Sequence, residues 1–243
     1  AMWSGPRNIS TALLRAWENR PDTVVCDEPL YAFYLQETGL PHPGREEVIA
    51  SQDTDWRRVV ARLTGPVPRG RAVFYQKHMA HHLLPGVGRE WLDRVTNAFL
   101  IRDPAEMIVS LSKTLPGATL ADTGLPQQWE LFERVADRTG GTPPVLDARD
   151  VLRAPGALLR RLCDAVDVPF REEMLSWPPG PRDTDGVWAK HWYAAVEAST
   201  GFAPYRPRTE RMPDALATLH DACRPYYDRL HIHRLRAADA PPS

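Results

Sequence analysis

The sequence predicts an α/β fold built on an open, mainly parallel five-stranded sheet flanked by helices. Short apolar runs that suit buried strands recur along the chain, and each ends in a polar turn. Most of these turns lead into segments with apolar residues at helical spacing. Strands that alternate with helices favour parallel pairing, because the helix carries the chain back to the same end of the sheet. At 243 residues the chain suits a single domain, residues 1–243.

The composition narrows the class of protein. Lys and Arg total 30 and Asp and Glu total 31, so no overall basic field favours nucleic acid as a partner. No apolar run approaches the roughly 20 residues of a membrane-spanning helix, and no signal-peptide pattern opens the chain. The three cysteines are far apart in apolar surroundings, which favours reduced thiols and a cytoplasmic protein.

The first strand-to-helix unit, residues 1–20, contains the most informative loop. Its sequence is Gly5-Pro6-Arg7-Asn8-Ile9-Ser10-Thr11, and it lies between a short apolar run and a helical pattern. Backbone N–H groups and the positive end of a helix converge in such a loop, and Arg7 adds a planar cation, so we expect it to bind phosphate or sulfate. The alternative is a turn that Ser10 or Thr11 merely caps. The second glycine and the lysine of the ATP and GTP loop are missing.

The second unit places two acids at a strand end. Thr23-Val24-Val25-Cys26 predicts a buried strand and leads directly into Asp27 and Glu28. Ligands gather at the carboxyl ends of parallel strands, so both acids should lie near the anion loop if the first two strands are neighbours. The alternative is a structural role, in which Asp27 caps a helix that begins at Pro29 and Glu28 favours its first turn.

The third unit brings histidines to a strand end. Residues 71–76 predict a strand, and Lys77, His78, His81 and His82 follow it. Imidazole titrates near neutral pH, which suits a base or a group that binds the acceptor. His78 and His82 have the spacing of zinc ligands on a helix, but a clear third ligand and the glutamate of the zinc-protease motif are missing. We therefore expect no metal.

The fourth unit, residues 97–114, has a well-marked helix start. Its strand, residues 97–101, ends at Arg102, and Asp103 is a predicted cap that precedes Pro104 at the first helical position. Ser110 lies two turns up this helix. Arg102 is a candidate anion ligand at the strand tip, and the alternatives are a salt bridge for Arg102 and an exposed helix position for Ser110.

The remaining elements carry no chemical motif of their own. Residues 127–138 predict a helix, residues 143–152 a fifth strand that leads into a helix, and residues 157–166 another helix. Residues 176–188 predict a loop and residues 189–193 the start of a helix. Residues 212–235 predict the final helix, and residues 237–243 a tail.

Three of these features together resemble the sulfotransferases that use 3′-phosphoadenosine 5′-phosphosulfate (PAPS). They are the order Pro-Arg-x-x-Ser-Thr before an apolar helix, the pair Arg102 and Ser110, and the strand-to-helix passage that ends at Val168-Pro169-Phe170. The sequence looks most like the bacterial branch that acts on small molecules. This resemblance implies a sheet and phosphate loop similar to those of the P-loop nucleoside triphosphatases.

The same resemblance implies PAPS as the sulfuryl donor and adenosine 3′,5′-bisphosphate (PAP) as its product. Residues 1–20 would bind the 5′-phosphosulfate through the loop from Gly5 to Thr11, and residues 97–114 would bind the 3′-phosphate through Arg102 and Ser110. In the family a basic C-terminal loop closes over the cofactor. Arg182 and Lys190, in the segment 176–193, are the nearest candidates here, although the usual Arg-Lys-Gly sequence is absent.

In the implied reaction, a hydroxyl or an amine of a small-molecule acceptor attacks sulfur in line with the departing 5′-phosphate. Arg7 and the loop N–H groups would offset the charge on the leaving phosphate, without magnesium. A glutamate shortly after the second strand is the base in the bacterial branch, and Glu28 matches that position. The cytosolic animal branch uses a histidine where this chain has Met79. His78, His81 and His82 remain alternative bases.

Two other functions stay open from the sequence. A nucleotide kinase of the P-loop class would share the fold but needs the missing lysine, and a non-catalytic PAP-binding module would need no base. The expected partner is a small-molecule acceptor, with neither nucleic acid nor a membrane, and a homodimer is left open.

Overall fold

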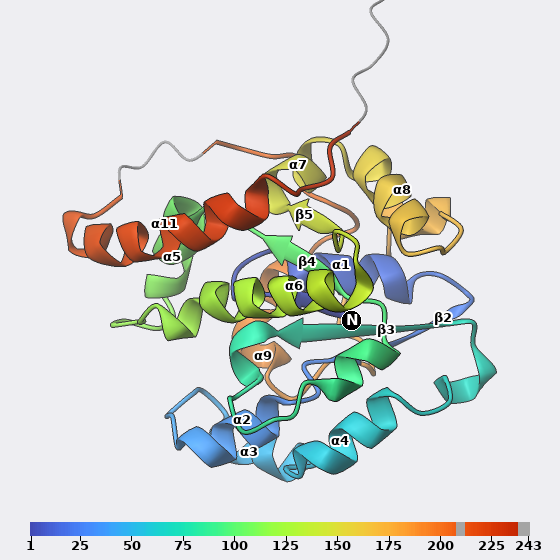
Figure 1. Ribbon diagram of the computed structural model, residues 1–243, viewed down its shortest axis with the longest axis horizontal. Coiled ribbons are helices and arrows are strands. Elements are labelled where there is room, and N and C mark those ends of the chain that lie inside the picture. Colours follow the sequence, from blue (N-terminus) through green and yellow to red (C-terminus); the bar gives the residue numbers. More distant parts are fainter. Residues whose placement is uncertain (208–211, 238–243) are drawn as a thin grey trace, which may run out of the picture.

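The computed structural model describes residues 1–207 and 212–237 of the chain. The five strands of this part form one sheet in which every neighbouring pair is parallel. They are β1 (Met2–Ser4), β2 (Thr23–Asp27), β3 (Val73–Met79), β4 (Ala98–Ile101) and β5 (Val145–Asp147). Their order across the sheet is β2-β3-β1-β4-β5, and Figure 1 labels β2, β3, β4 and β5. The predicted fold class is confirmed.

Helices flank the sheet. In the described residues they are α1 (Ser10–Glu18), α2 (Tyr31–Thr38), α3 (Arg45–Ser51), α4 (Trp56–Leu63), α5 (Pro104–Ser112), α6 (Leu125–Thr139), α7 (Ala148–Arg153), α8 (Pro155–Ala165), α9 (Ala189–Trp192), α10 (Ala194–Glu197) and α11 (Ala217–His231). Two short 3₁₀ segments matter for the site, η2 (Ala80–His82) and η4 (Ala121–Thr123). α11 packs along α5 and α6 (Figure 1).

Strand side chains alternate between two apolar cores, because successive residues of a strand point to opposite faces. Trp3 of β1 and Phe99 of β4 belong to one core, with residues of α4, α5, α6 and α11. Met2 and Leu100, which neighbour them in the sequence, belong to the other core, with residues of α1, α7 and α8. Both faces of the sheet are therefore covered, as is usual for parallel sheets.

β1 lies in the middle of the sheet, and the chain winds from it first to one side and then to the other. β2 and β3 lie on one side, and the chain then crosses to β4 and β5. The carboxyl end of β1 is thus the point at which ligands bind in open α/β sheets. β1 and β2 are not neighbours, because β3 lies between them, and Lys77 of β3 pairs in register with both Met2 and Asp27.

Several predicted boundaries were wrong. β3 continues to Met79 because its last residues pair with β1, so His78 is in the strand and the helical spacing expected for His78 and His82 is not formed. α2 begins at Tyr31 with Leu30 as its N-cap, so Asp27 is not a helix cap. The final helix spans Ala217–His231. Residues 208–211, and residues 238–243 of the predicted tail, lie outside the described residues.

Within residues 1–207 and 212–237, no helix combines the length and the apolar character that crossing a membrane requires.

Candidate active site

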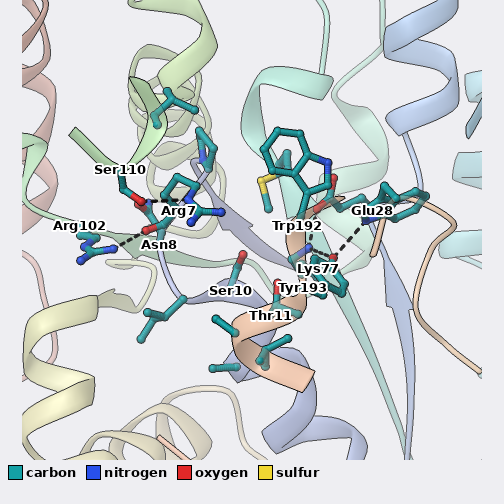
Figure 2. Close-up of a pocket in the computed structure, with 18 of the residues that line it drawn as sticks. Arg7, Asn8, Ser10, Thr11, Glu28, Lys77, Arg102, Ser110, Trp192 and Tyr193 are labelled. Atoms are coloured by element: carbon teal, nitrogen blue, oxygen red, sulfur yellow. Dashed lines mark hydrogen bonds and ion pairs between the residues drawn. The ribbon is translucent and has the colours of Figure 1, made fainter. Parts of the chain in front are cut away.

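A cavity of about 370 Å³ opens at the carboxyl ends of the strands. Its walls come from the loops after β1, β2, β3 and β4 and from residues 188–203. Among the predicted site residues, those that line it are Pro6, Arg7, Asn8, Ile9, Ser10, Thr11, Glu28, His82, Arg102 and Ser110. Figure 2 shows Arg7, Arg102 and Ser110 on one side, Glu28, Lys77 and Tyr193 on the other, and Ser10 and Thr11 between them.

The loop after β1 adopts an unusual backbone conformation. Arg7 and Ile9 have φ angles of 61° and 60°, the left-handed region that costs free energy for residues with a side chain. A Cβ on Gly5 would lie 2.2 Å from the carbonyl oxygen of Thr123, so only glycine fits there. Gly5 itself lies just behind the cavity wall and shapes the loop.

The N-terminus of α1 has no side-chain cap. Ile9 is its N-cap residue and makes no capping hydrogen bond, so the alternative in which Ser10 or Thr11 caps the helix is not formed. The first N–H groups of a helix have no partner inside the helix. They therefore add donors, and the positive end of the helix dipole, to the wall of the cavity.

Arg7, Arg102 and Ser110 form one hydrogen-bonded group. Arg7 Nε donates to Ser110 Oγ (3.0 Å), and an Arg102 guanidinium nitrogen donates to the carbonyl oxygen of Arg7 (2.7 Å). Arg102 also makes the expected alternative contact, a salt bridge to Glu106 (3.1 Å). Asp103 caps α5 as predicted, accepting from the N–H of Ala105. The turn after β4 thus carries Arg102 to the loop after β1.

The electrostatics of this group favour an anion. Burial lowers the pKa of Arg7, and the nearby charge of Arg102 lowers it further. Within the described residues, no carboxylate lies within ion-pair distance of Arg7, and the hydroxyls of Ser10 and Thr11 make no hydrogen bond. Arg102 is paired with Glu106, so the unpaired Arg7 guanidinium and the uncapped helix end supply the surplus of positive charge and of hydrogen-bond donors.

On the other side of the cavity, a buried lysine holds two carboxylates. Lys77 Nζ lies 2.7 Å from Asp27 Oδ1 and 2.6 Å from Glu28 Oε1. The hydroxyl of Tyr193 donates to Asp27 Oδ2 (2.6 Å) and accepts from Lys77 Nζ (2.8 Å) and from Trp188 Nε1 (3.1 Å). Lys77, Asp27 and Tyr193 thereby fix the position of the Glu28 carboxylate.

The charges of this cluster depend on one another. Burial raises the pKa of Glu28, the charge of Lys77 opposes that effect, and the charge of Asp27 adds to it. Burial alone would lower the pKa of Lys77, but the charges of Asp27 and Glu28 raise it well above the ordinary value. Lys77 is therefore a permanent cation, and Glu28 is a carboxyl group that gains a proton more readily than an exposed glutamate.

The backbone of Glu28 is strained as well. Its φ angle is 42°, and its N–H donates to the carbonyl oxygen of Lys77 (2.9 Å), which continues the β2–β3 pairing by one residue. The side-chain amide of Gln52 donates to the Glu28 carbonyl oxygen (3.3 Å). Strain that neighbouring contacts hold in place is common where a side chain must be aimed at a ligand.

The histidines occupy three different places. His78 lies outside the cavity, stacked on Trp3 with ring centroids 4.3 Å apart. His82 lines the cavity, with Nδ1 4.0 Å from Glu28 Oε2, and His81 lies next to it. Burial lowers the pKa of His78 and His82 well below the imidazole value and that of His81 to about 4, so all three are neutral at pH 7. The described residues contain no His, Cys, Asp and Glu group that could hold a metal ion.

The segment 176–193 contributes aromatic rather than basic side chains. Trp188, Trp192 and Tyr193 line the cavity. Arg182 bonds to the carbonyl oxygen of Pro178 and lies 3.9 Å from Glu18, while Lys190 pairs with Glu47 at the surface. Neither Arg182 nor Lys190 lines the cavity, because each points toward an acid or a carbonyl group elsewhere.

Sequence reasoning expected Asp27 near the anion loop but gave neither Asp27 nor Lys77 a role in the site, and it missed Tyr193. A weak signal existed for the first two, since a lysine in an otherwise buried strand needs carboxylates nearby, and two acids end the preceding strand. Tyr193 had no such signal. It is 116 positions from Lys77 in the sequence, and only the packed structure brings them together.

Known proteins are similar to this chain in sequence and in fold. The model of the sulfotransferase domain family matches residues 1–233. Branched-chain-amino-acid aminotransferase-like protein 1 of Arabidopsis thaliana is 35% identical over 232 residues, which are 95% of this chain and 41% of that protein. The chain thus spans well under half the length of that relative.

Two solved structures share the fold. The sulfotransferase domain from the curacin biosynthetic pathway has a TM-score of 0.52 and 17% identity, covering 95% of this chain and 96% of that domain. A sulfotransferase from Alicyclobacillus acidocaldarius has a TM-score of 0.51 and 17% identity, covering 98% of this chain and 97% of the other. Because the family model extends over nearly the whole chain, this protein belongs to the sulfotransferase domain family.

Proposed function

We propose that this protein transfers a sulfuryl group from PAPS to a hydroxyl, or an amine, of a small-molecule acceptor. The observation that carries the proposal is the division of one cavity into two halves. Arg7, Arg102 and the uncapped end of α1 form a half that suits an anion, and Glu28 lies across the cavity from them (Figure 2). A donor that bears phosphates and an acceptor that loses a proton need these two kinds of group.

The donor half fits the chemistry of PAPS. The 5′-phosphosulfate would contact Arg7, the loop N–H groups and the hydroxyls of Ser10 and Thr11. None of these groups is paired with a carboxylate in the described residues. The 3′-phosphate would meet Arg102 and Ser110. Removal of one donor to a developing negative charge costs about 2.7 to 4 kcal/mol in comparable enzymes, so Arg7 is the residue we expect to stabilise the leaving phosphate.

Glu28 serves as the base in this proposal. When bound, PAPS supplies a sulfuryl group on a bridging oxygen, so the bond from sulfur to the acceptor oxygen forms as the bond to the 5′-phosphate breaks. The acceptor proton passes to the Glu28 carboxylate. Lys77 and Tyr193 hold the Asp27–Glu28 pair in place, and His82 stays neutral beside it. A positioned base typically contributes about 10²- to 10⁴-fold to the rate.

The pH dependence should reflect the buried position of Glu28. Only the carboxylate accepts the proton, and burial raises the pKa of this group, so activity falls as pH drops through that raised pKa. We expect kcat/KM to show an acid limb above the ordinary glutamate pKa of about 4.3. A pH profile at constant ionic strength measures it. Full activity maintained down to about pH 4 would contradict a raised Glu28 pKa.

Binding of PAP tests the donor half. Arg102→Ala removes a charge-assisted contact to phosphate, so the affinity for PAP should weaken by about 1.5 to 3 kcal/mol, or roughly 10- to 150-fold. Isothermal titration calorimetry on the folded variant measures this. Arg182→Ala is the matched control, because Arg182 lies outside the cavity and should leave PAP affinity unchanged. Equal affinity in the wild type and Arg102→Ala would refute the assignment of Arg102.

Transfer itself separates an enzyme from a non-catalytic PAP-binding module. Incubation of the protein with PAPS and a mixture of metabolites should yield products that are heavier by one SO₃, detected by mass spectrometry, together with PAP. Tight PAP binding without any such product would instead favour the binding module.

A further inference from the structure

The half of the cavity that holds Glu28 has an unusual balance of charge. Among the described residues that line the whole cavity, those with a formal charge at pH 7 are Arg7, Arg102, Lys77, Glu28 and Asp122. The first two belong to the donor half, and Lys77 is neutralised by Glu28 and by Asp27 behind it. Asp122 lies in η4, which packs against the histidine segment η2, so its negative charge belongs to the half that contains His82 and Glu28.

Asp122 has no cationic partner in residues 1–207 and 212–237. Its Oδ2 accepts from the N–H and the hydroxyl of Thr119, both at 2.7 Å, and it is half-buried in η4. A half-buried carboxylate at the wall of a cavity attracts a cation, because the low local dielectric strengthens the interaction.

A row of neutral rings lies between Glu28 and Asp122. His82 Nδ1 is 4.0 Å from Glu28 Oε2, and the His81 and His82 ring centroids are 4.4 Å apart. The segment η2, which contains both histidines, packs against η4, which contains Asp122. The negative charge of Asp122 acts to raise the pKa of His81 and of His42, against the larger lowering by burial. Glu28 and Asp122 thus lie at the two ends of this row.

These rings have nitrogen atoms that no group in the described residues satisfies. Nδ1 of His81 and Nδ1 of His82 are buried without a hydrogen-bond partner, although the side chains are 9% and 2% exposed and line the cavity. Nε2 of His42 is also unsatisfied. Because these imidazoles are neutral, they do not repel a cation.

We propose that the acceptor is a hydroxy-amine, with its hydroxyl at Glu28 and a positively charged ammonium group between Asp122 and the rings. The aromatic side chains of Tyr31 and Trp192 line the same cavity, and Tyr31 stacks on His82 with ring centroids 4.5 Å apart. An acceptor with a carboxylate in that position meets Asp122 and is repelled. This inference rests on the proposed function only in taking this half of the cavity as the acceptor site.

Matched sets of small molecules test the preference for positive charge. Tyramine, para-ethylphenol and para-hydroxyphenylacetate share a phenol and differ in the charge at the far end, and aminohexanol, hexanol and hydroxyhexanoate form an aliphatic set. We expect the amine of at least one set to bind about tenfold or more tightly than its neutral counterpart, and the carboxylate to bind weakest. Calorimetry with and without saturating PAP measures all six.

Variants then locate the preference. Asp122→Asn should bring the ratio of amine to neutral affinity close to one. Thr119→Ala removes a hydrogen bond to Asp122 but keeps its charge, and Asp164→Asn removes an exposed charge on α8, so both should keep the wild-type ratio. Circular dichroism and PAP affinity report on the fold of each variant.

The two proposals fail in different ways. The acceptor inference is overturned if neither amine binds more tightly than its neutral counterpart, or if Asp122→Asn keeps the wild-type ratio. Absence of PAP binding would overturn the proposed function, and the amine preference measured without PAP would still decide the inference.

Discussion

Glu28→Gln is expected to lower kcat by about two orders of magnitude or more while PAP affinity stays close to that of the wild type. Glutamine keeps the size of the side chain and removes the group that accepts the acceptor proton. Lys77 would keep its ion pair with Asp27 (2.7 Å), so the buried charge stays balanced and the fold should survive. Steady-state kinetics with PAPS and calorimetry with PAP measure the two effects separately.

His82→Gln is the matched comparison for the base. His82 lies beside Glu28, but burial lowers its pKa well below the imidazole value, which makes it a weak acceptor of protons. We expect this variant to retain most of its turnover. If Glu28→Gln turned over normally while His82→Gln bound PAP but was inactive, the base would be His82, and Glu28 would serve only the structure of the β2 end.

Lys77→Met is expected to have the largest effect on stability. Lys77 is fully buried and neutralises two buried carboxylates. Removal of one partner from such a group leaves uncompensated charge in a low dielectric and costs about 3 to 5 kcal/mol. The midpoint of urea unfolding should fall accordingly at an unchanged m value. Activity should fall too, because Glu28 loses the contact that holds its carboxylate.

The loss of stability in Lys77→Met should increase as pH rises. Burial raises the pKa of Glu28 and the charge of Lys77 opposes that effect; without Lys77 the folded protein therefore holds a proton on Glu28 that the unfolded chain releases, so stability falls as pH rises. The variant should therefore be more destabilised at pH 8 than at pH 5. Lys190→Met is the control, since its ion pair with Glu47 lies at the surface and solvent screens such pairs, so that they contribute little to stability. Equal, small losses in both variants would contradict the role of Lys77.

Local sequence patterns were sufficient to predict the strands of the sheet and most of the helices. A strand or an amphipathic helix is stabilised by side chains that are close in sequence and face one core, so its pattern can be recognised before the fold is known. The helix start at Asp103 and Pro104 is an example. The Asp103 side chain caps the helix and Pro104 lacks a backbone N–H, and both effects depend only on residues next to each other in the sequence. The end of β3 was wrong because Lys77, His78 and Met79 extend the strand only by pairing with β1.

The residues of the candidate site also divide into those that the sequence could predict and those that it could not. Arg7, Ser10, Thr11 and Glu28 follow strands directly, so their place at one edge of a parallel sheet could be inferred from the sequence, and their roles remain predictions. Arg182 and Lys190 were predicted as cofactor ligands because they are basic residues in the segment that matches the basic C-terminal loop of the family. The structure places both against other partners, because a long basic side chain binds whichever acid the packing brings near.

By itself, the sequence determined the kind of fold and the loop that suits an anion. Only the tertiary structure decided that β3 lies between β1 and β2, so that Lys77 meets Asp27 and Glu28, and that Tyr193 closes this cluster from a distant segment. It also decided that Asp122 faces the buried histidines. The physical reason is that backbone pattern depends on near neighbours, whereas the charge and protonation of buried groups depend on whichever residues the packed chain places beside them.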